Sequence, residues 1–130
     1  MFKHATNSKK QGDIGLATAI NWFVANGYTV SIPLTDSQDY DLIVDNGNIP
    51  EKVQIKTTTQ SNKSGSYEVG LRVLGGNQSW SGVVKHFDNT KVDIVFVLCD
   101  NGDKYVIPAK TITSKNSISV GSKWREFKVA

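Results

Sequence analysis

The feature that most constrains the fold is a pair of strand patterns joined by a tight turn. Residues 40–45 read YDLIVD, an apolar stretch bounded by acids, and residues 51–58 read EKVQIKTT, in which apolar and polar side chains alternate. Such alternation is typical of a strand with one face on a core. The intervening Asn46-Gly47-Asn48 has the composition of a tight turn. Together these segments predict a β-hairpin.

The register of this hairpin decides which polar side chains share a face. If the turn is centred between Gly47 and Asn48, Asp41 lies opposite Gln54, with Lys56 diagonal to it. An acid, an amide and a lysine then converge on one face, which suits a divalent cation bound beside a phosphate. A solvated cross-strand ion pair between Asp41 and Lys56, worth less than about 1 kcal/mol, is the alternative interpretation.

A helix is expected before the hairpin, over about residues 9–26. Apolar side chains recur there at helical spacing, and Asn26-Gly27 is a suitable stop. Asp13 extends the same stripe, so we expect the helix to cover the polar hairpin face and to bring it a second carboxylate. In the alternative interpretation, Asp13 is a first-turn acid compensated by the helix dipole. The stripe consists of Leu16, Ala17, Ile20, Phe23 and Val24.

The rest of the chain predicts more strands and one short helix. Residues 1–130 are expected to form a single α/β (α+β) domain, in which the N-terminal helix packs on a central mixed sheet of about five or six strands. The core is expected over residues 9–112, and residues 113–130 are expected to form a C-terminal strand or tail. Strands are predicted at 28–33, 67–74, 92–99, 104–108 and 123–129, and a short helix at 81–88.

Composition and charge narrow the class of protein. Cys99 is the only cysteine, which excludes an internal disulfide and a CxxC zinc site. No apolar run is long enough to span a membrane, and the first residues lack the apolar stretch of a secretory signal, so a cytoplasmic location is expected. The net charge of +3 combines an acidic middle, residues 13–103, with basic ends. That distribution favours a cation site within a scaffold that meets phosphates.

The order of the motifs resembles a known nuclease superfamily. GDIGLA on the expected helix, YDLIVD on the next strand and VQIKT a dozen residues later look like the PD-(D/E)XK nucleases. The likeness is greatest to the small homing endonucleases associated with group I introns, a branch that also resembles archaeal Holliday-junction resolvases. The later hairpin DNGDKYVIP resembles the strand pair that follows in this branch. The likeness covers residues 9–112 and implies a restriction-endonuclease-like core.

The resemblance implies roles for four side chains and one main-chain carbonyl. Asp41 would be the principal metal ligand and Lys56 the catalytic lysine. Asp13 stands where the family has a helix-borne acid, usually glutamate. Gln54 replaces the usual second acid, as glutamine often does in the intron-associated branch, and the carbonyl of Ile55 would be a further ligand. The implied cofactor is Mg²⁺, for which Mn²⁺ would substitute.

Two departures from the family pattern affect the metal. Asp13 is one methylene shorter than glutamate, which points to a contact with the metal through water. Gln54 removes a negative charge and so weakens metal binding. A non-catalytic DNA-binding module of the same fold therefore stands as an alternative to an enzyme.

The predicted function is a Mg²⁺-dependent DNA endonuclease that hydrolyses phosphodiester bonds in double-stranded or branched DNA. A Holliday-junction resolvase with the same site is the nearest alternative. One chain of this size covers little DNA, so a homodimer or homotetramer is expected. Trp80 is interpreted either as a wedge between bases or as a side chain folded back on the core. The candidate DNA contacts are Lys9, Lys10, Thr58, Lys63, Arg72, Trp80 and Lys85.

Overall fold

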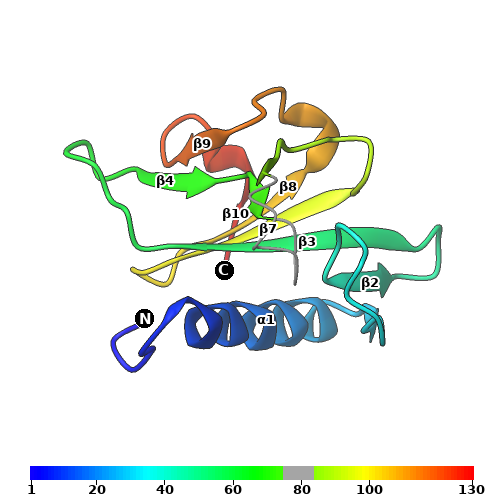
Figure 1. The fold of residues 1–130 in the computed structure, drawn as a ribbon. Helices are drawn as coiled ribbons and strands as arrows, with labels where there is room; N and C mark the ends of the chain where they lie inside the picture. The colour runs from blue at the N-terminus through cyan, green and yellow to red at the C-terminus, as the bar shows by residue number, and fades with distance from the viewer. Residues whose placement is uncertain (75–83) are drawn as a thin grey trace.

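Helix α1 (Ser8–Ala25) lies against one face of a six-stranded mixed sheet, and a smaller two-stranded sheet lies on the other face (Figure 1). The computed structural model describes residues 1–74 and 84–130. This arrangement confirms the predicted N-terminal helix on a mixed sheet. In spatial order, the large sheet consists of β1 (Thr29–Ser31), β2 (Leu42–Asp45), β3 (Glu51–Thr58), β7 (Ile94–Cys99), β8 (Lys104–Pro108) and β10 (Lys128–Val129).

The two central strands, β3 and β7, run parallel, and the other neighbours in this sheet are antiparallel. Every residue of β7 is buried. A strand covered on both faces needs apolar residues throughout instead of alternation, which explains the continuous IVFVLC sequence of β7. The polar face of β3 is mixed, because Lys52 is exposed and Lys56 is half-buried, whereas Gln54 and Thr58 are buried.

The predicted strand over residues 67–74 is interrupted in the structure. β4 (Tyr67–Gly70) pairs with β9 (Ser117–Val120), whereas β5 (Val73–Leu74) pairs with β6 (Val84–Lys85). The expected helix over residues 81–88 is wrong in its described part, because that part begins with β6.

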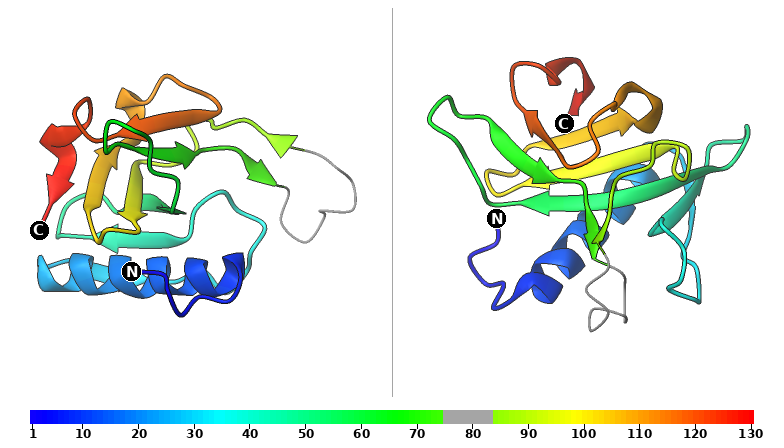
Figure 2. Two further views of the ribbon diagram at one scale, coloured as in Figure 1. Left: turned by 90° about the vertical axis from the view of Figure 1, so that its left-hand side faces the viewer. Right: turned by 45° about the horizontal axis from the view of Figure 1, so that its top comes forward.

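The C-terminal part also differs from the prediction. Its alternating pattern over residues 123–129 forms a 3-10 turn, η3 (Arg125–Phe127), and only the last two residues of the pattern join the sheet as β10. Strand β9 was not predicted, and it is part of the cover on the far face of the large sheet (Figure 2). A second 3-10 turn, η2 (Ala109–Thr111), follows β8.

Helix α1 begins at a side-chain cap, and the face that it turns to the core overlaps the predicted stripe only in part, at Leu16, Ile20 and Phe23. The Asn7 side chain accepts a hydrogen bond from the backbone N–H of Lys10, as is usual at an N-cap. The buried side of the helix consists of Gly15, Ala19 and Phe23. Ala17 and Val24, two members of the predicted stripe, are exposed. No helix within the described residues is both long and apolar enough to cross a lipid bilayer.

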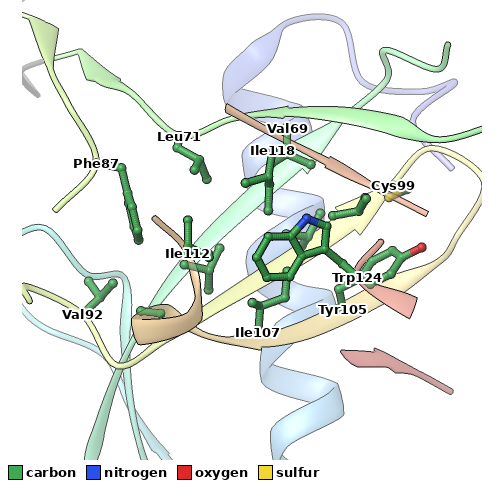
Figure 3. Packing of buried hydrophobic residues seen from close by; sticks show 14 residues of the cluster. Val69, Leu71, Phe87, Val92, Cys99, Tyr105, Ile107, Ile112, Ile118 and Trp124 are labelled. Carbon is green, nitrogen blue, oxygen red and sulfur yellow. The ribbon is translucent and has the colours of Figure 1, made fainter. Parts of the chain in front are cut away.

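The large sheet separates two hydrophobic clusters. Between the sheet and α1, Phe23 packs edge-on against Tyr28 and near Phe96, with centroid distances of 5.2 and 5.9 Å. On the opposite face, the Trp124 indole lies in the cluster that contains Ile107 and Ile118 (Figure 3). Both faces of the central strands are therefore covered, and the sheet is a rigid base for the polar groups at its edge.

Candidate metal-binding site

The candidate site forms where β2 ends and β3 continues. Leu42 pairs with Val53, which is the register predicted from the turn, and the N–H of Asp41 donates to the Val53 carbonyl at 2.8 Å. Beyond this pair β3 continues to Thr58, and none of the described strands lies beside that edge of it. The backbone groups there have no partner strand, so they are available to side chains or ligands.

The Asp41 carboxylate takes the place of the missing strand. Its Oδ2 accepts a hydrogen bond of 2.7 Å from the backbone N–H of Ile55. In a strand, the N–H and C=O of one residue point to the same side, so the Ile55 carbonyl lies on this edge as well. The carboxylate of Asp41 and the carbonyl of Ile55 are therefore neighbouring oxygen donors at one end of the hairpin.

Helix α1 brings the second predicted carboxylate to the same place. A surface hollow is lined by Asp13 from the helix, by Asp41, and by Ile55 and Thr57 of β3, together with Lys9, Gly12 and Leu16. Asp13 is exposed in this hollow. It lies in the second turn of α1, whose first turn contains no acid. The interpretation of Asp13 as a first-turn acid is therefore wrong.

The helix does not cover the face of the hairpin that we predicted. It packs on Val53 and Ile55, whereas Gln54 of the other face is buried and lines a separate hollow with Asp39 and Lys85. The apolar residues of β3 meet the apolar side of the helix, and side-chain alternation then turns Gln54 away from α1. Asp13 and Asp41 still share a hollow because Asp41 precedes β2 and lies at the end of the sheet edge.

Asp41 and Lys56 perturb one another and are both affected by burial. Burial raises the pKa of Asp41 although solvent still reaches its side chain, and the Ile55 N–H and the Lys56 charge lower it in part. Burial lowers the pKa of Lys56, and the charge of Asp41 opposes that change. In each residue desolvation is the largest effect, so the ionic forms are less favoured than in water. Paired groups of this kind are common at functional sites.

The donor set at this edge fits a hard divalent cation. Two carboxylates and a main-chain carbonyl are the oxygen ligands that Mg²⁺ and Mn²⁺ accept, with water completing the coordination. Within the described parts of the chain, no three His, Cys, Asp or Glu side chains gather into a metal cluster.

The structure separates the predicted DNA contacts into three groups. The basic residues are all exposed, with Lys9 lining the hollow of Asp13 and Lys85 placing Nζ 3.5 Å from Asp39 Oδ1. Thr58 is wrong as a DNA contact, because it is buried and its hydroxyl donates to the Glu68 carbonyl. Trp80 lies outside the described residues. The exposed basic residues are Lys9, Lys10, Lys63, Arg72 and Lys85.

Sequence reasoning missed the contact that fixes the distance between α1 and β3. Gln11 Nε2 donates to Thr57 Oγ1 at 2.8 Å, and one turn later Gly15 is buried against the same threonine. A glycine inside a helix costs roughly 0.5–1 kcal/mol relative to alanine, so it normally has a packing reason. Gly15 within the helical pattern was the signal for this contact.

Comparison with known proteins identifies a family and two similar solved structures. The family model for PD-(D/E)XK endonucleases matches residues 6–126, so the resemblance extends further toward the C-terminus than the predicted limit of residue 112. Comparison with curated proteins found no match. Among solved structures, the bacterial homing endonuclease I-Ssp6803I is 30% identical, with a TM-score of 0.68, over 88% of this chain and 75% of that one.

A second solved structure shares the fold at much lower identity. It is Hjc, a Holliday junction resolvase from the archaeal hyperthermophile Archaeoglobus fulgidus, with a TM-score of 0.57 and 10% identity. The match covers 92% of this chain and 90% of that chain. At this identity the likeness concerns the fold alone. The match of the family model over nearly the whole chain carries the assignment: this chain belongs to the PD-(D/E)XK endonuclease family.

Proposed function

We propose that this chain is a divalent-metal-dependent DNA endonuclease that hydrolyses phosphodiester bonds in the manner of a homing endonuclease. The observation that carries the proposal is the hollow between α1 and β3, which Asp13, Asp41 and Ile55 line together and in which Asp41 accepts a hydrogen bond from the Ile55 N–H. Family membership and the 30% identity to a homing endonuclease support the reaction class. Mg²⁺ is the expected ion, and Mn²⁺ should substitute for it.

The residues of the site would have two roles, metal binding and stabilisation of the charge that develops on the phosphate. Asp13, Asp41 and the Ile55 carbonyl would hold the cation, which when bound supplies Lewis-acid activation of the phosphate and of water. The hydrogen bond from the Ile55 N–H holds the Asp41 carboxylate in place. Lys56, attracted to Asp41, would orient the attacking water and balance the charge that develops on the phosphate.

The exposed basic residues at the mouth of the hollow would hold the DNA backbone. Lys9 lines the hollow itself, and Lys10 follows it in the first turn of α1. Contacts of this kind position the duplex without reading its sequence. Because one chain of 130 residues covers only a short stretch of duplex, a symmetric homodimer or homotetramer would be needed for a longer site.

The test is a nicking assay on plasmid DNA with Mg²⁺, with Mn²⁺ and with chelator. Asp41→Asn and Lys56→Met should each lower the cleavage rate by about 100-fold or more, as expected for removal of a group that acts in the transition state. DNA affinity in the absence of cleavage should remain nearly unchanged. Asp41→Asn should also melt close to the wild type, because asparagine can still accept the Ile55 hydrogen bond.

Two matched variants control for charge and position. Asp45→Asn removes a carboxylate at the other end of β2. Lys52→Met removes a lysine from the same face of β3 as Lys56, four residues earlier in the strand. Both should cleave at the wild-type rate. If the wild type is inert with either metal but still binds DNA, the protein is a non-catalytic DNA-binding module. If only four-way junctions are cut and linear duplex is not, the protein is a resolvase and the homing proposal is wrong.

A further inference from the structure

Helix α1 approaches the sheet closely at Gly15, which is buried. A Cβ atom built on this glycine would lie 2.5 Å from Thr57 Cγ2 and 3.3 Å from Ile55 Cγ2. The first distance is shorter than real Cβ contacts allow. The obstacle is the Thr57 methyl group, which could turn away only by a rotation of the side chain that would also move the hydroxyl accepting from Gln11. Any side chain at position 15 would therefore widen the gap between α1 and β3 by about 1 Å, to reach an ordinary contact of 3.4 Å.

The same helical face is also tied to the same threonine. Gln11, one turn before Gly15, donates from Nε2 to Thr57 Oγ1 at 2.8 Å. Thr57 thus makes two contacts with α1, one through its hydroxyl and one through its methyl group. Together these contacts fix the distance between α1 and β3 and the position of the helix along the strand.

Asp13 lies between these two contacts in the sequence, on the flank of the helix that borders the hollow. Aspartate has the shorter acidic side chain, so its carboxylate reaches only a short distance from the helix. Its separation from Asp41 and from the Ile55 backbone therefore depends on how closely the helix approaches β3. A shift of about 1 Å is large whether Asp13 contacts the metal directly or through a bound water, because oxygen–metal distances and hydrogen-bond lengths each vary by only a few tenths of an ångström.

We propose that Gly15 and Thr57 are positioning residues, which hold α1 close enough to β3 for the short side chain of Asp13 to serve the metal site. The inference rests on the proposed function, since it assumes that Asp13 acts on a bound cation. It adds that the glycine contact compensates for the short acid. Gly15 does not line the hollow, whereas Thr57 does. Both would act through the position of Asp13, by their contact with each other and by the hydrogen bond from Gln11 to Thr57.

The first test is Gly15→Ala, with Asn21→Ala as a control in the same helix. Asn21 is exposed and does not line the hollow, so its substitution should preserve the melting temperature or raise it. Gly15→Ala should lower the melting temperature. It should also raise the Mg²⁺ concentration for half-maximal nicking, and the Mn²⁺ dissociation constant measured by calorimetry, by about 10-fold, the scale on which residues that support metal ligands act.

Two second substitutions separate positioning from a purely structural role. Thr57→Ser removes the obstructing methyl group and keeps the hydroxyl for Gln11, so Gly15→Ala/Thr57→Ser exchanges one methyl for another in the same space. It should restore both the melting temperature and the metal affinity. Asp13→Glu adds one methylene of reach and leaves the packing unchanged. In the Gly15→Ala background it should restore metal affinity but not the melting temperature.

The outcomes distinguish this inference from the proposed function. If the wild type neither binds Mn²⁺ nor nicks DNA with any metal, the proposed function is wrong, and the inference that rests on it is wrong as well. If the wild type is active and Gly15→Ala melts earlier with an unchanged metal dependence, only the positioning role is wrong. It is also wrong if Asp13→Glu restores no metal affinity while Thr57→Ser restores the melting temperature.

Discussion

The two hairpins at the centre of the large sheet are built alike but completed differently. In the β7–β8 hairpin, five residue pairs join strands of six and five residues. In the β2–β3 hairpin, three pairs join strands of four and eight residues. Strand β3 therefore runs past its partner, and Asp41 and Ile55 meet at the point where the pairing stops.

This difference separates stability from chemistry within one sheet. Complete pairing satisfies the backbone groups of β7, whose residues are all buried. Incomplete pairing leaves backbone groups of β3 on one edge, where a carboxylate and a cation can use them. The buried strands should therefore carry the folding free energy, and the unpaired edge of β3 should carry activity at little cost in stability.

The largest stability effect should come from the core of the complete hairpin. Phe96→Ala removes a fully buried ring from β7 that packs near Phe23, and should lower the free energy of unfolding by about 3–5 kcal/mol. Ile49→Ala removes an exposed side chain from the β2–β3 turn, and should change it by less than about 0.5 kcal/mol. Urea unfolding followed by circular dichroism measures both. Similar losses in the two variants would contradict the division of roles.

Alanine substitution in the two hairpin turns should lower the free energy of unfolding by similar amounts, because the strain it introduces is confined to the turn. Gly102 in the β7–β8 turn has φ +90° and Gly47 in the β2–β3 turn has φ +101°, and a Cβ atom at either position would meet open space. Alanine at each should lower the free energy of unfolding by about 1–2 kcal/mol, the cost of a left-handed conformation for a residue with a side chain. A loss several times larger at Gly102 would show that the complete hairpin depends on its turn as well as on its core.

Local patterns predicted the elements of these hairpins well. The bounds of β3 and β8 agree with the predicted strands, because alternation and flanking turn residues are properties of a short segment. The register also followed from the turn, since counting outward from Gly47 and Asn48 gives the Leu42–Val53 pair. This is why Asp41 was correctly placed at the end of the hairpin.

Features that depend on packing between distant segments were not predictable in the same way. Strand β9 has four residues and is defined by its pairing with β4, about fifty residues earlier in the chain. The prediction that α1 covers the polar face of the hairpin was wrong. The helix packs its buried face, which includes Gly15, on the apolar residues of β3. The site was therefore predicted as a set of residues, whereas its division between two hollows was visible only in the structure.

The smallest effect concerns the reactivity of Cys99 at the end of β7. Its side chain is 1% exposed, and burial above all raises the pKa of the thiol to about 12, so at pH 8 only about one molecule in ten thousand would carry the reactive thiolate. A coloured disulfide reagent should therefore modify the native protein no faster than the protein unfolds, and should react at once in concentrated guanidinium chloride. Phe96→Ala should accelerate the labelling because it populates open states of β7, whereas Ile49→Ala should leave the rate unchanged. Rapid labelling of the native wild type would mean that β7 opens locally, and that the complete hairpin is less rigid than its pairing implies.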